Sequence, residues 1–189
     1  MRIIAGTARG LSLKVPHGTR VRPTSGRVRT SLFSILADCL EGARVADLFA
    51  GCGALGIEAL SRGAASCAFV ENARQALAAL RDNLARARLA DRATVLVHDA
   101  FDAASLIGAA GPLDLVLVDP PYRVLHEQPQ RFLTLMKGLA PGLAPDGFVV
   151  VQHDGQTVFP SAIGCLRLTD RRSYGATGIT FFTLAESRS

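Results

Sequence analysis

The sequence contains no long apolar run. Its apolar stretches, such as residues 115–118 and 148–151, are far shorter than the roughly 18 residues that a membrane-spanning helix needs. No export signal is predicted, because Arg9 interrupts the N-terminus too early for the apolar region of a signal peptide. We therefore expect a cytoplasmic protein that has no membrane partner, and we favour a monomer.

Closely spaced cysteine pairs are also missing. The four cysteines, Cys39, Cys52, Cys67 and Cys165, are scattered along the chain without any C-x-x-C spacing. A structural zinc site or a disulfide framework would need closer and more regular spacing. We predict no metal site, and we expect the cysteines to be small buried side chains in a reducing compartment.

Acidic residues are absent before Asp38, although the whole chain carries 21 basic and 16 acidic residues. The basic residues of this N-terminal stretch are Arg2, Arg9, Lys14, Arg20, Arg22, Arg27 and Arg29. Without these seven, 14 basic residues face 16 acidic ones, so residues 38–189 carry a net charge of −2. A basic block this one-sided is typical of an arm that contacts phosphates.

The composition predicts one globular unit that is preceded by this basic arm. Hydrophobic residues make up 49% of the 189 residues and charged residues 20%, which allows a full core and excludes general disorder. Residues 2–16 predict a short β-hairpin, residues 16–23 a loop with an N-cap at Thr24 or Ser25, and the apolar spacing of residues 28–39 a helix. We divide the chain into an extension, residues 1–43, and a main domain, residues 44–189.

Strands and helices alternate from Arg44 onward. Strands are predicted at residues 44–49, 66–71, 93–97, 113–118 and 147–152. Helices are predicted at residues 54–62, 73–88, 102–109 and 129–140. This alternation indicates an α/β fold with a mainly parallel sheet and helices on both faces. Two further strand-like runs, residues 165–170 and 178–184, predict an antiparallel pair that closes the sheet.

A glycine-rich turn joins the first of these strands to its helix. Gly51, Gly53 and Gly56 have the G-x-G-x-x-G spacing that lets a backbone approach a ligand at a helix N-terminus. Glu71 lies 20 residues after Gly51, at the end of the next strand, where a carboxylate accepts both ribose hydroxyls. These residues indicate a ligand that contains adenosine, and they leave NAD open.

Two carboxylates favour S-adenosylmethionine over NAD. Asp47 precedes the glycines, where it would hold the ammonium group of an amino-acid portion and would repel a pyrophosphate. Asp99 follows the third strand, where it would accept from an adenine amino group, cap the next helix, or do both.

The residues Asp119-Pro120-Pro121-Tyr122 follow an apolar strand, at the edge of the sheet where α/β proteins bind ligands. The prolines fix φ and remove N–H donors, which leaves carbonyls exposed. A nucleobase amino group is a poor nucleophile because its lone pair is delocalised into the ring. Asp119 and the Pro120 carbonyl would accept its N–H groups and turn the lone pair toward a methyl donor, while Tyr122 would stack on the base.

Residues 47–56 and 119–122 together resemble the class I S-adenosylmethionine-dependent amino-methyltransferases. Motifs in residues 2–6, 9–10, 22–33 and 53–63 narrow the resemblance to the RsmD family, bacterial enzymes that methylate a guanine N2 in 16S ribosomal RNA. The resemblance covers nearly the whole chain. It implies a Rossmann-like methyltransferase sheet of seven strands, preceded by a small extension of a β-hairpin and a helix.

The resemblance and the residue patterns together give the expected site. The catalytic residues are expected to be Asp119, Pro120, Pro121 and Tyr122. The residues expected to bind S-adenosylmethionine and its product S-adenosylhomocysteine are Asp47, Phe49, Ala50, Gly51, Gly53, Gly56, Glu71, Asn72, Asp99 and Ala100. The residues expected to contact RNA are Arg20, Arg22, Thr24, Arg27 and Arg29. The expected partner is 16S ribosomal RNA, either free or in the assembling small subunit.

Four positions depart from the family pattern, and some alternatives stay open. Gly26 stands where the family usually has an acidic residue, Cys52 where it commonly has Ser, and Thr30 and Gln152 where it usually has Glu. A DNA methyltransferase would need a target-recognition domain, for which the 67 residues after Tyr122 leave no room. An oxidoreductase or a plain RNA-binding module would leave residues 119–122 unexplained. Methylation of adenine N6 or cytosine N4 in a nucleic acid remains the alternative.

Overall fold

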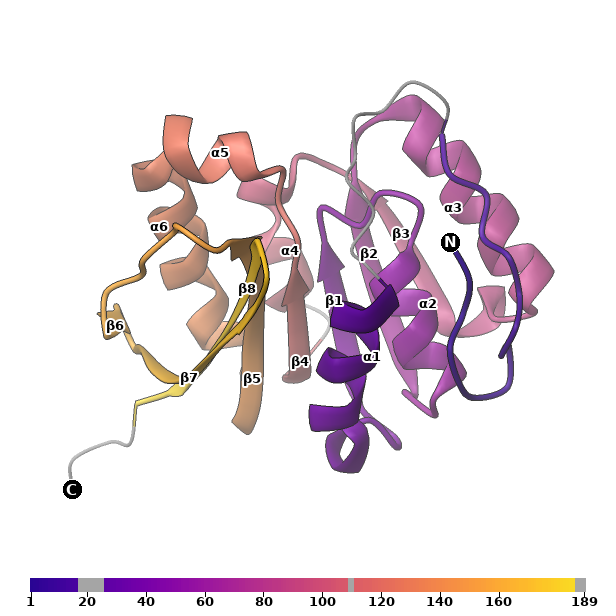
Figure 1. Ribbon diagram of the computed structural model, residues 1–189, viewed down its shortest axis with the longest axis horizontal. Helices are drawn as coiled ribbons and strands as arrows, with labels where there is room; N and C mark the ends of the chain where they lie inside the picture. The colour runs from indigo at the N-terminus through magenta and orange to yellow at the C-terminus, as the bar shows by residue number, and fades with distance from the viewer. Residues whose placement is uncertain (17–25, 109–110, 186–189) are drawn as a thin grey trace.

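The structure is a computed structural model that describes residues 1–16, 26–108 and 111–185 (Figure 1). The predicted loop after Pro16 and the predicted N-cap at Thr24 or Ser25 lie outside the described residues. Within the described ranges, no helix is long and apolar enough to cross a membrane.

One sheet forms the centre of the molecule. Its strands are β1 (Arg44–Leu48), β2 (Ser66–Glu71), β3 (Ala93–Val97), β4 (Leu113–Val118), β5 (Leu143–Asp154), β6 (Ala162–Ile163), β7 (Leu166–Tyr174) and β8 (Thr177–Leu184). Their order across the sheet is β3-β2-β1-β4-β5-β8-β7-β6. Strands β1 to β5 pair in parallel, and β6 to β8 form an antiparallel edge, which confirms the predicted architecture. The described part has eight strands rather than the expected seven, because the short β6 pairs with β7.

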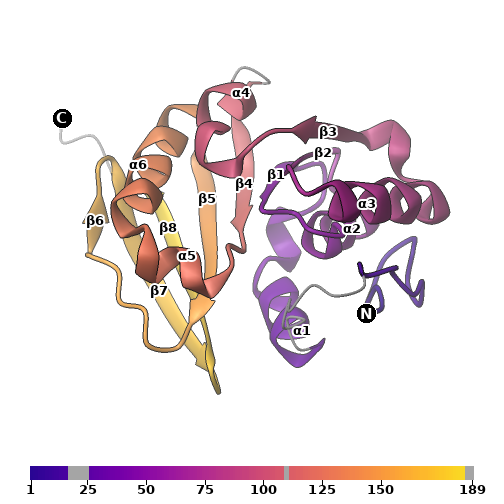
Figure 2. The ribbon, with the colours of Figure 1, turned by 90° about the horizontal axis from the view of Figure 1, so that it is seen from above.

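Helices cover both faces of the sheet (Figure 2). They are α1 (Gly26–Ile35), α2 (Ala54–Ser61), α3 (Arg74–Ala87), α4 (Ala104–Gly108), α5 (Tyr122–Glu127) and α6 (Pro129–Leu139). Single 3₁₀ turns are η1 (Ala37–Cys39), η2 (Ala90–Arg92), η3 (Ala100–Asp102) and η4 (Ala140–Gly142). The first three helices pack on one face, and α4 to α6 pack on the other.

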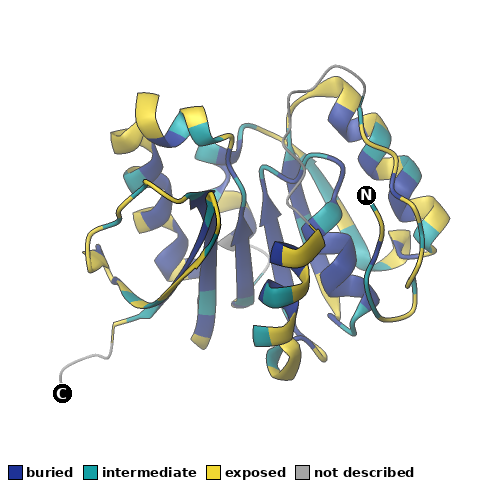
Figure 3. Cartoon of the chain, viewed as in Figure 1, coloured by how far each residue is buried: buried dark blue, intermediate teal, exposed yellow. Residues whose placement is uncertain are grey.

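The alternation of side chains along each strand builds these two cores. In β4, Leu115 and Leu117 belong to the core under α1 and α2, whereas Val116 and Val118 belong to the core under α4 and α6. Successive residues of a strand point to opposite faces, so an unbroken apolar strand supplies both layers. Figure 3 shows the buried strands between helices that are exposed on their outer sides.

The N-terminal extension differs from the predicted hairpin. One isolated antiparallel bridge, between Arg2 and Ser12, replaces the two regular strands, although the Ile3 and Leu13 amides donate across to the Leu11 and Met1 carbonyls. Other N–H groups of this segment donate to α2, which interrupts the regular pairing. The amides of Ile4 and Ala5 donate to the buried Glu58 carboxylate at 2.8 and 3.1 Å.

Two further differences lie close to the sheet's carboxyl edge. The helix expected at residues 102–109 is divided into η3 and the short α4. Helix α5 was not anticipated, and it begins at Tyr122, directly after the two prolines of the turn. Proline is well suited to this position, because a helix leaves its first N–H groups without partners. The turn that carries the expected catalytic residues is therefore also the start of a helix.

Candidate active site

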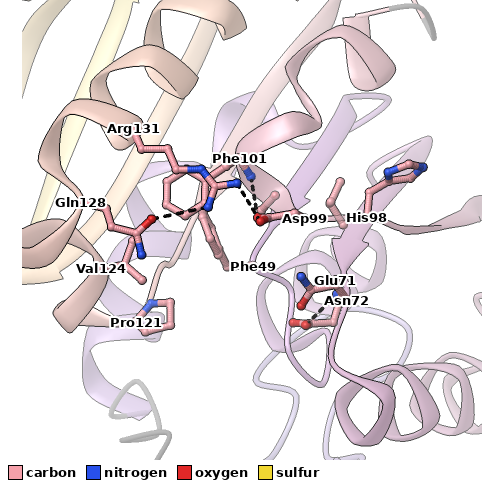
Figure 4. Close-up of a pocket in the computed structure, with 12 residues that line it drawn as sticks. Phe49, Glu71, Asn72, His98, Asp99, Phe101, Pro121, Val124, Gln128 and Arg131 are labelled. Carbon is pink, nitrogen blue, oxygen red and sulfur yellow. Dashed lines mark hydrogen bonds and ion pairs between the residues drawn. The ribbon is translucent and has the colours of Figure 1, made fainter.

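The strand order creates a crevice between β1 and β4. From β1 the chain runs outward through β2 to β3 and then crosses back to β4, on the other side of β1. Ligands of α/β proteins bind at such a reversal, at the carboxyl ends of the strands. A cavity of about 240 Å³ is lined by residues at or after the carboxyl ends of β1 to β4 and by residues of the α5–α6 segment (Figure 4).

The cavity brings together part of the expected site. The expected residues that line it are Phe49, Glu71, Asn72, Asp99, Ala100 and Pro121. The other expected cofactor and catalytic residues do not line this cavity: Asp47, Ala50, Gly51, Gly53, Gly56, Asp119, Pro120 and Tyr122. Carboxylates from the β2 and β3 ends thus share one cavity with Pro121 from the turn after β4.

The glycine loop has a strained and tightly packed backbone. Phe49, at its start, has a φ of 59°, which is uncommon for a residue other than glycine and recurs at functional sites. Gly53 has a φ of 83° and precedes α2. A Cβ atom at Gly56 would lie 2.3 Å from the Phe69 ring, so this glycine permits α2 to approach β2. Gly56 therefore serves packing of the loop rather than direct contact with the cavity.

The Glu71 carboxylate joins the glycine loop to the end of β2. Its Oε2 accepts from the Gly51 amide at 2.8 Å, and its Oε1 accepts from the amides of Asn72 and Ala73, each at 2.8 Å. These backbone donors fix the carboxylate at the cavity wall. Because a carboxylate offers about four acceptor sites and three are used by these amides, Glu71 retains capacity for about one further donor.

Asp47 has a different role from the one expected. Its side chain is 1% exposed, and its Oδ2 accepts from the Gly56 amide at 2.8 Å. Burial raises the pKa of Asp47 well above its usual range, and the charges of Asp119 and Glu71 raise it further. A buried side chain that is already bonded to the loop is poorly placed to hold a ligand's ammonium group. We therefore correct the expectation: Asp47 shapes the glycine loop.

Asp99 has the predicted capping role and an additional partner. Its carboxylate accepts from the Phe101 amide at 3.1 Å and so caps η3. Its other oxygen accepts from Arg131 of α6 at 2.9 Å. The Arg131 guanidinium also lies over the Phe101 ring, 4.2 Å from its centre, and Phe49 meets that ring edge-on. Sequence reasoning missed Arg131, which lies 32 positions from Asp99 and carries no local signal.

The turn after β4 is tied to its neighbours at three points. The Asp119 amide donates to the Leu48 carbonyl at the end of β1, at 3.4 Å. The Asp119 carboxylate accepts from Gln152 of β5 at 2.9 Å. The Tyr122 hydroxyl lies 3.3 Å from the Thr177 hydroxyl of β8. Neither Gln152 nor Thr177 was expected to contact the site.

Two arginines of the basic arm that were both expected to contact RNA differ in their exposure. Arg27 is exposed on α1, but Arg29 is 2% exposed and donates to the Arg2 carbonyl at 2.6 Å. Burial lowers the pKa of Arg29. A buried guanidinium cannot reach a phosphate, so we remove Arg29 from the expected RNA contacts. Arg20, Arg22 and Thr24 lie outside the described residues.

The parallel sheet with its antiparallel edge, the glycine loop and the cavity at the strand reversal define a methyltransferase-like α/β fold. The family model described as Conserved hypothetical protein 95 matches residues 1–183. The chain therefore belongs to this family, the RsmD family.

Known relatives agree with this assignment. YlbH of Bacillus subtilis, which carries the provisional name of an rRNA methyltransferase, is 37% identical over 96% of this chain and 98% of its own. Ribosomal RNA small subunit methyltransferase D of Escherichia coli is 43% identical over 65% of this chain and 61% of its own. The solved structure of yhhF from Escherichia coli, provisionally titled a methyltransferase, is 33% identical, covers 99% of both chains and has a TM-score of 0.81.

Proposed function

We propose that this protein transfers a methyl group from S-adenosylmethionine to the exocyclic N2 of a guanine in 16S ribosomal RNA. The observation that carries the proposal is the shared cavity. Glu71 and Asp99, suited to an adenosine, line the same cavity as Pro121, which belongs to the turn suited to a nucleobase amino group. A methyl donor and its acceptor must meet in one place, and this arrangement allows it.

The residues of the cavity fit S-adenosylmethionine. When bound, the cofactor supplies an activated methyl group and leaves as S-adenosylhomocysteine. Glu71, fixed by three backbone amides, would accept from a ribose hydroxyl. Asp99 would accept from the adenine amino group, and the Phe49 and Phe101 rings, whose centres are 5.3 Å apart, offer an apolar wall for the base.

Asp119 and the Pro120 carbonyl would hold the target amino group. Asp119 follows β4 and is fixed by β1 and β5, so its carboxylate is positioned before a substrate arrives. Tyr122, half-buried at the start of α5, would stack on the target base. The guanine has to leave its stack to reach this turn, as in other enzymes that modify bases. Its N2 would give up one proton as the new N–C bond forms.

The RNA would be bound outside the cavity by the basic arm. Relatives named small subunit methyltransferase D support the small-subunit RNA as the partner, free or in an assembling subunit in the cytoplasm. Residues 38–189 carry a net charge of −2, so the arm would supply most phosphate contacts. We assign this role to the exposed Arg27 and, on sequence grounds, to Arg20, Arg22 and Thr24.

The test is mass spectrometry of nucleosides from the ribosomal RNA of a strain that lacks the gene. We expect 16S RNA to lose one N2-methylguanosine, which the parent protein restores and the Asp119→Ala protein does not. Loss of an N6-methyladenosine or an N4-methylcytidine instead would favour the alternative amino-methyltransferase. An unchanged set of nucleosides in ribosomal RNA would contradict the proposed function and would direct the search for the alternative to DNA and other RNAs.

A further inference from the structure

Gln152 lies beside Asp119 because of the register between two strands. In the parallel pair β4 and β5, Val118 is opposite Val151, so the residues that follow them, Asp119 and Gln152, are neighbours. The Gln152 side chain is 4% exposed, and its Nε2 donates to Asp119 Oδ1 at 2.9 Å. A donor that is buried on a central strand has little freedom to move, so this contact restricts the orientation of the carboxylate.

We propose that Gln152 is a positioning residue that holds the Asp119 carboxylate in the orientation needed for methyl transfer. This inference rests on the proposed function, in which Asp119 accepts from the target amino group. One carboxylate oxygen accepts from the amide, which restricts the directions in which the carboxylate can point. Orientation of this kind matters greatly, since a misplacement of about 1 Å costs an enzyme about 100-fold in rate.

The family usually has Glu at this position, whereas the Gln152 amide of this chain is a neutral donor beside Asp119. Asp47 on β1 is buried nearby and interacts electrostatically with Asp119, so acidic groups already crowd the strand ends. Tyr122 lies on the same turn as Asp119. His153 follows Gln152 on the opposite face of β5, where its ring bonds Thr180 and meets Phe159. An amide donates at every pH, whereas a carboxyl group donates only while it is protonated.

The Gln152→Met and Gln152→Glu variants test the proposal. Methionine has a similar volume but no donor, so we expect kcat to fall by about 10–100-fold while the affinity for S-adenosylmethionine stays within about twofold. Glutamate restores the donor only when the pair of acids shares a proton. We therefore expect Gln152→Glu to approach the parent's rate at low pH and to lose rate as the pH rises. Gln130→Glu, an exposed change on α6, is the charge control and should follow the parent's pH profile.

Unfolding measurements test the contact between Gln152 and Asp119 independently of enzymatic activity. The Gln152→Met and Asp119→Ala changes, alone and combined, form a double-mutant cycle. We expect the combined effect on the unfolding equilibrium to depart from the product of the single effects by about fivefold or more. Independent effects, or a Gln152→Met enzyme with the parent's kcat, would overturn the proposal. If the parent methylated no ribosomal RNA, the proposed function would fail, while the cycle would still decide whether Gln152 holds Asp119.

Discussion

The two sides of the cavity are held in place by different kinds of contact. On the cofactor side, carboxylates bind the backbone of the glycine loop: Asp47 accepts from Gly56, and Glu71 accepts from Gly51. The partners are only 9 and 20 residues apart in the sequence. The glycine loop is thus held by a local unit of one strand, one loop and the next strand, although Asp99 on the same side is bonded by the distant Arg131.

On the side of the catalytic turn, side chains from distant strands make the contacts. Gln152 of β5 reaches Asp119 across 33 residues, and Thr177 of β8 reaches Tyr122 across 55. Strand β8 of the antiparallel edge therefore supports the turn through Thr177. Different contacts therefore hold the cofactor loop and the catalytic turn. A single substitution should change either cofactor affinity or the methylation rate, but not both.

The largest effect is expected from Asp119→Ala. This change removes both the acceptor for the target amino group and the partner of Gln152, so the methylation rate should fall by at least about 10²–10⁴-fold. Binding of S-adenosylmethionine, measured by calorimetry, should be nearly unchanged because the Glu71 side remains intact. Near-normal turnover would show that the turn is not the catalytic side.

The next largest effect is expected from Glu71→Ala, which changes the cofactor side of the cavity. Loss of an acceptor for the ribose and for the Gly51 amide should weaken S-adenosylmethionine binding by about 1.5–3 kcal/mol, as for hydrogen bonds to charged groups. At saturating cofactor, kcat should stay close to the parent's value. Glu127→Ala, an exposed change on α5, is the control. Tight binding of NAD by the parent, with none of S-adenosylmethionine, would refute the cofactor assignment.

Sequence patterns could predict the turn and the glycine loop on both sides of this comparison, but not the distant side chains that support them. Asp47, the glycines and Glu71 form a short motif, and apolar runs located every strand of the parallel sheet to within a few residues. Gln152 and Arg131 could not be assigned, because their partners depend on the register of distant strands and on how α6 packs. The role of Asp47 also required burial, which no local pattern reveals.

Helical spacing in the sequence could have distinguished the two arginines of α1, of which one is buried and the other exposed. Arg29, Leu32, Phe33 and Leu36 follow the i, i+3, i+4, i+7 pattern of one helix face, and all four are buried. Arg27 lies off that face and is exposed. Counting charges treats both arginines alike, whereas helical periodicity distinguishes them.

A smaller effect, on stability alone, is expected from Asp47→Asn. The pKa of Asp47 is raised in the folded protein, so the folded state holds its proton more tightly than the unfolded state does. The parent should therefore lose stability as the pH rises from the ordinary aspartate value of 3.8 through the folded pKa. Asparagine keeps an acceptor for the Gly56 amide and removes this loss. Denaturant unfolding across the pH range should show a flatter profile for Asp47→Asn, and the exposed Asp91→Asn should leave the parent's profile unchanged.

The smallest effect is expected outside the cavity, from Arg27→Ala. Each phosphate contact on a single strand contributes about −0.7 to the slope of log K against log salt, so losing one contact should flatten the slope by about 0.7. Neither side of the cavity should respond, so cofactor affinity and stability should stay within about 0.5 kcal/mol of the parent's values. Arg29→Ala should do the opposite: it removes a buried donor to the Arg2 carbonyl, lowers stability and leaves the salt slope unchanged. Equal slopes for the parent and Arg27→Ala would mean that this arginine merely faces water, and the phosphate contacts would then have to lie elsewhere.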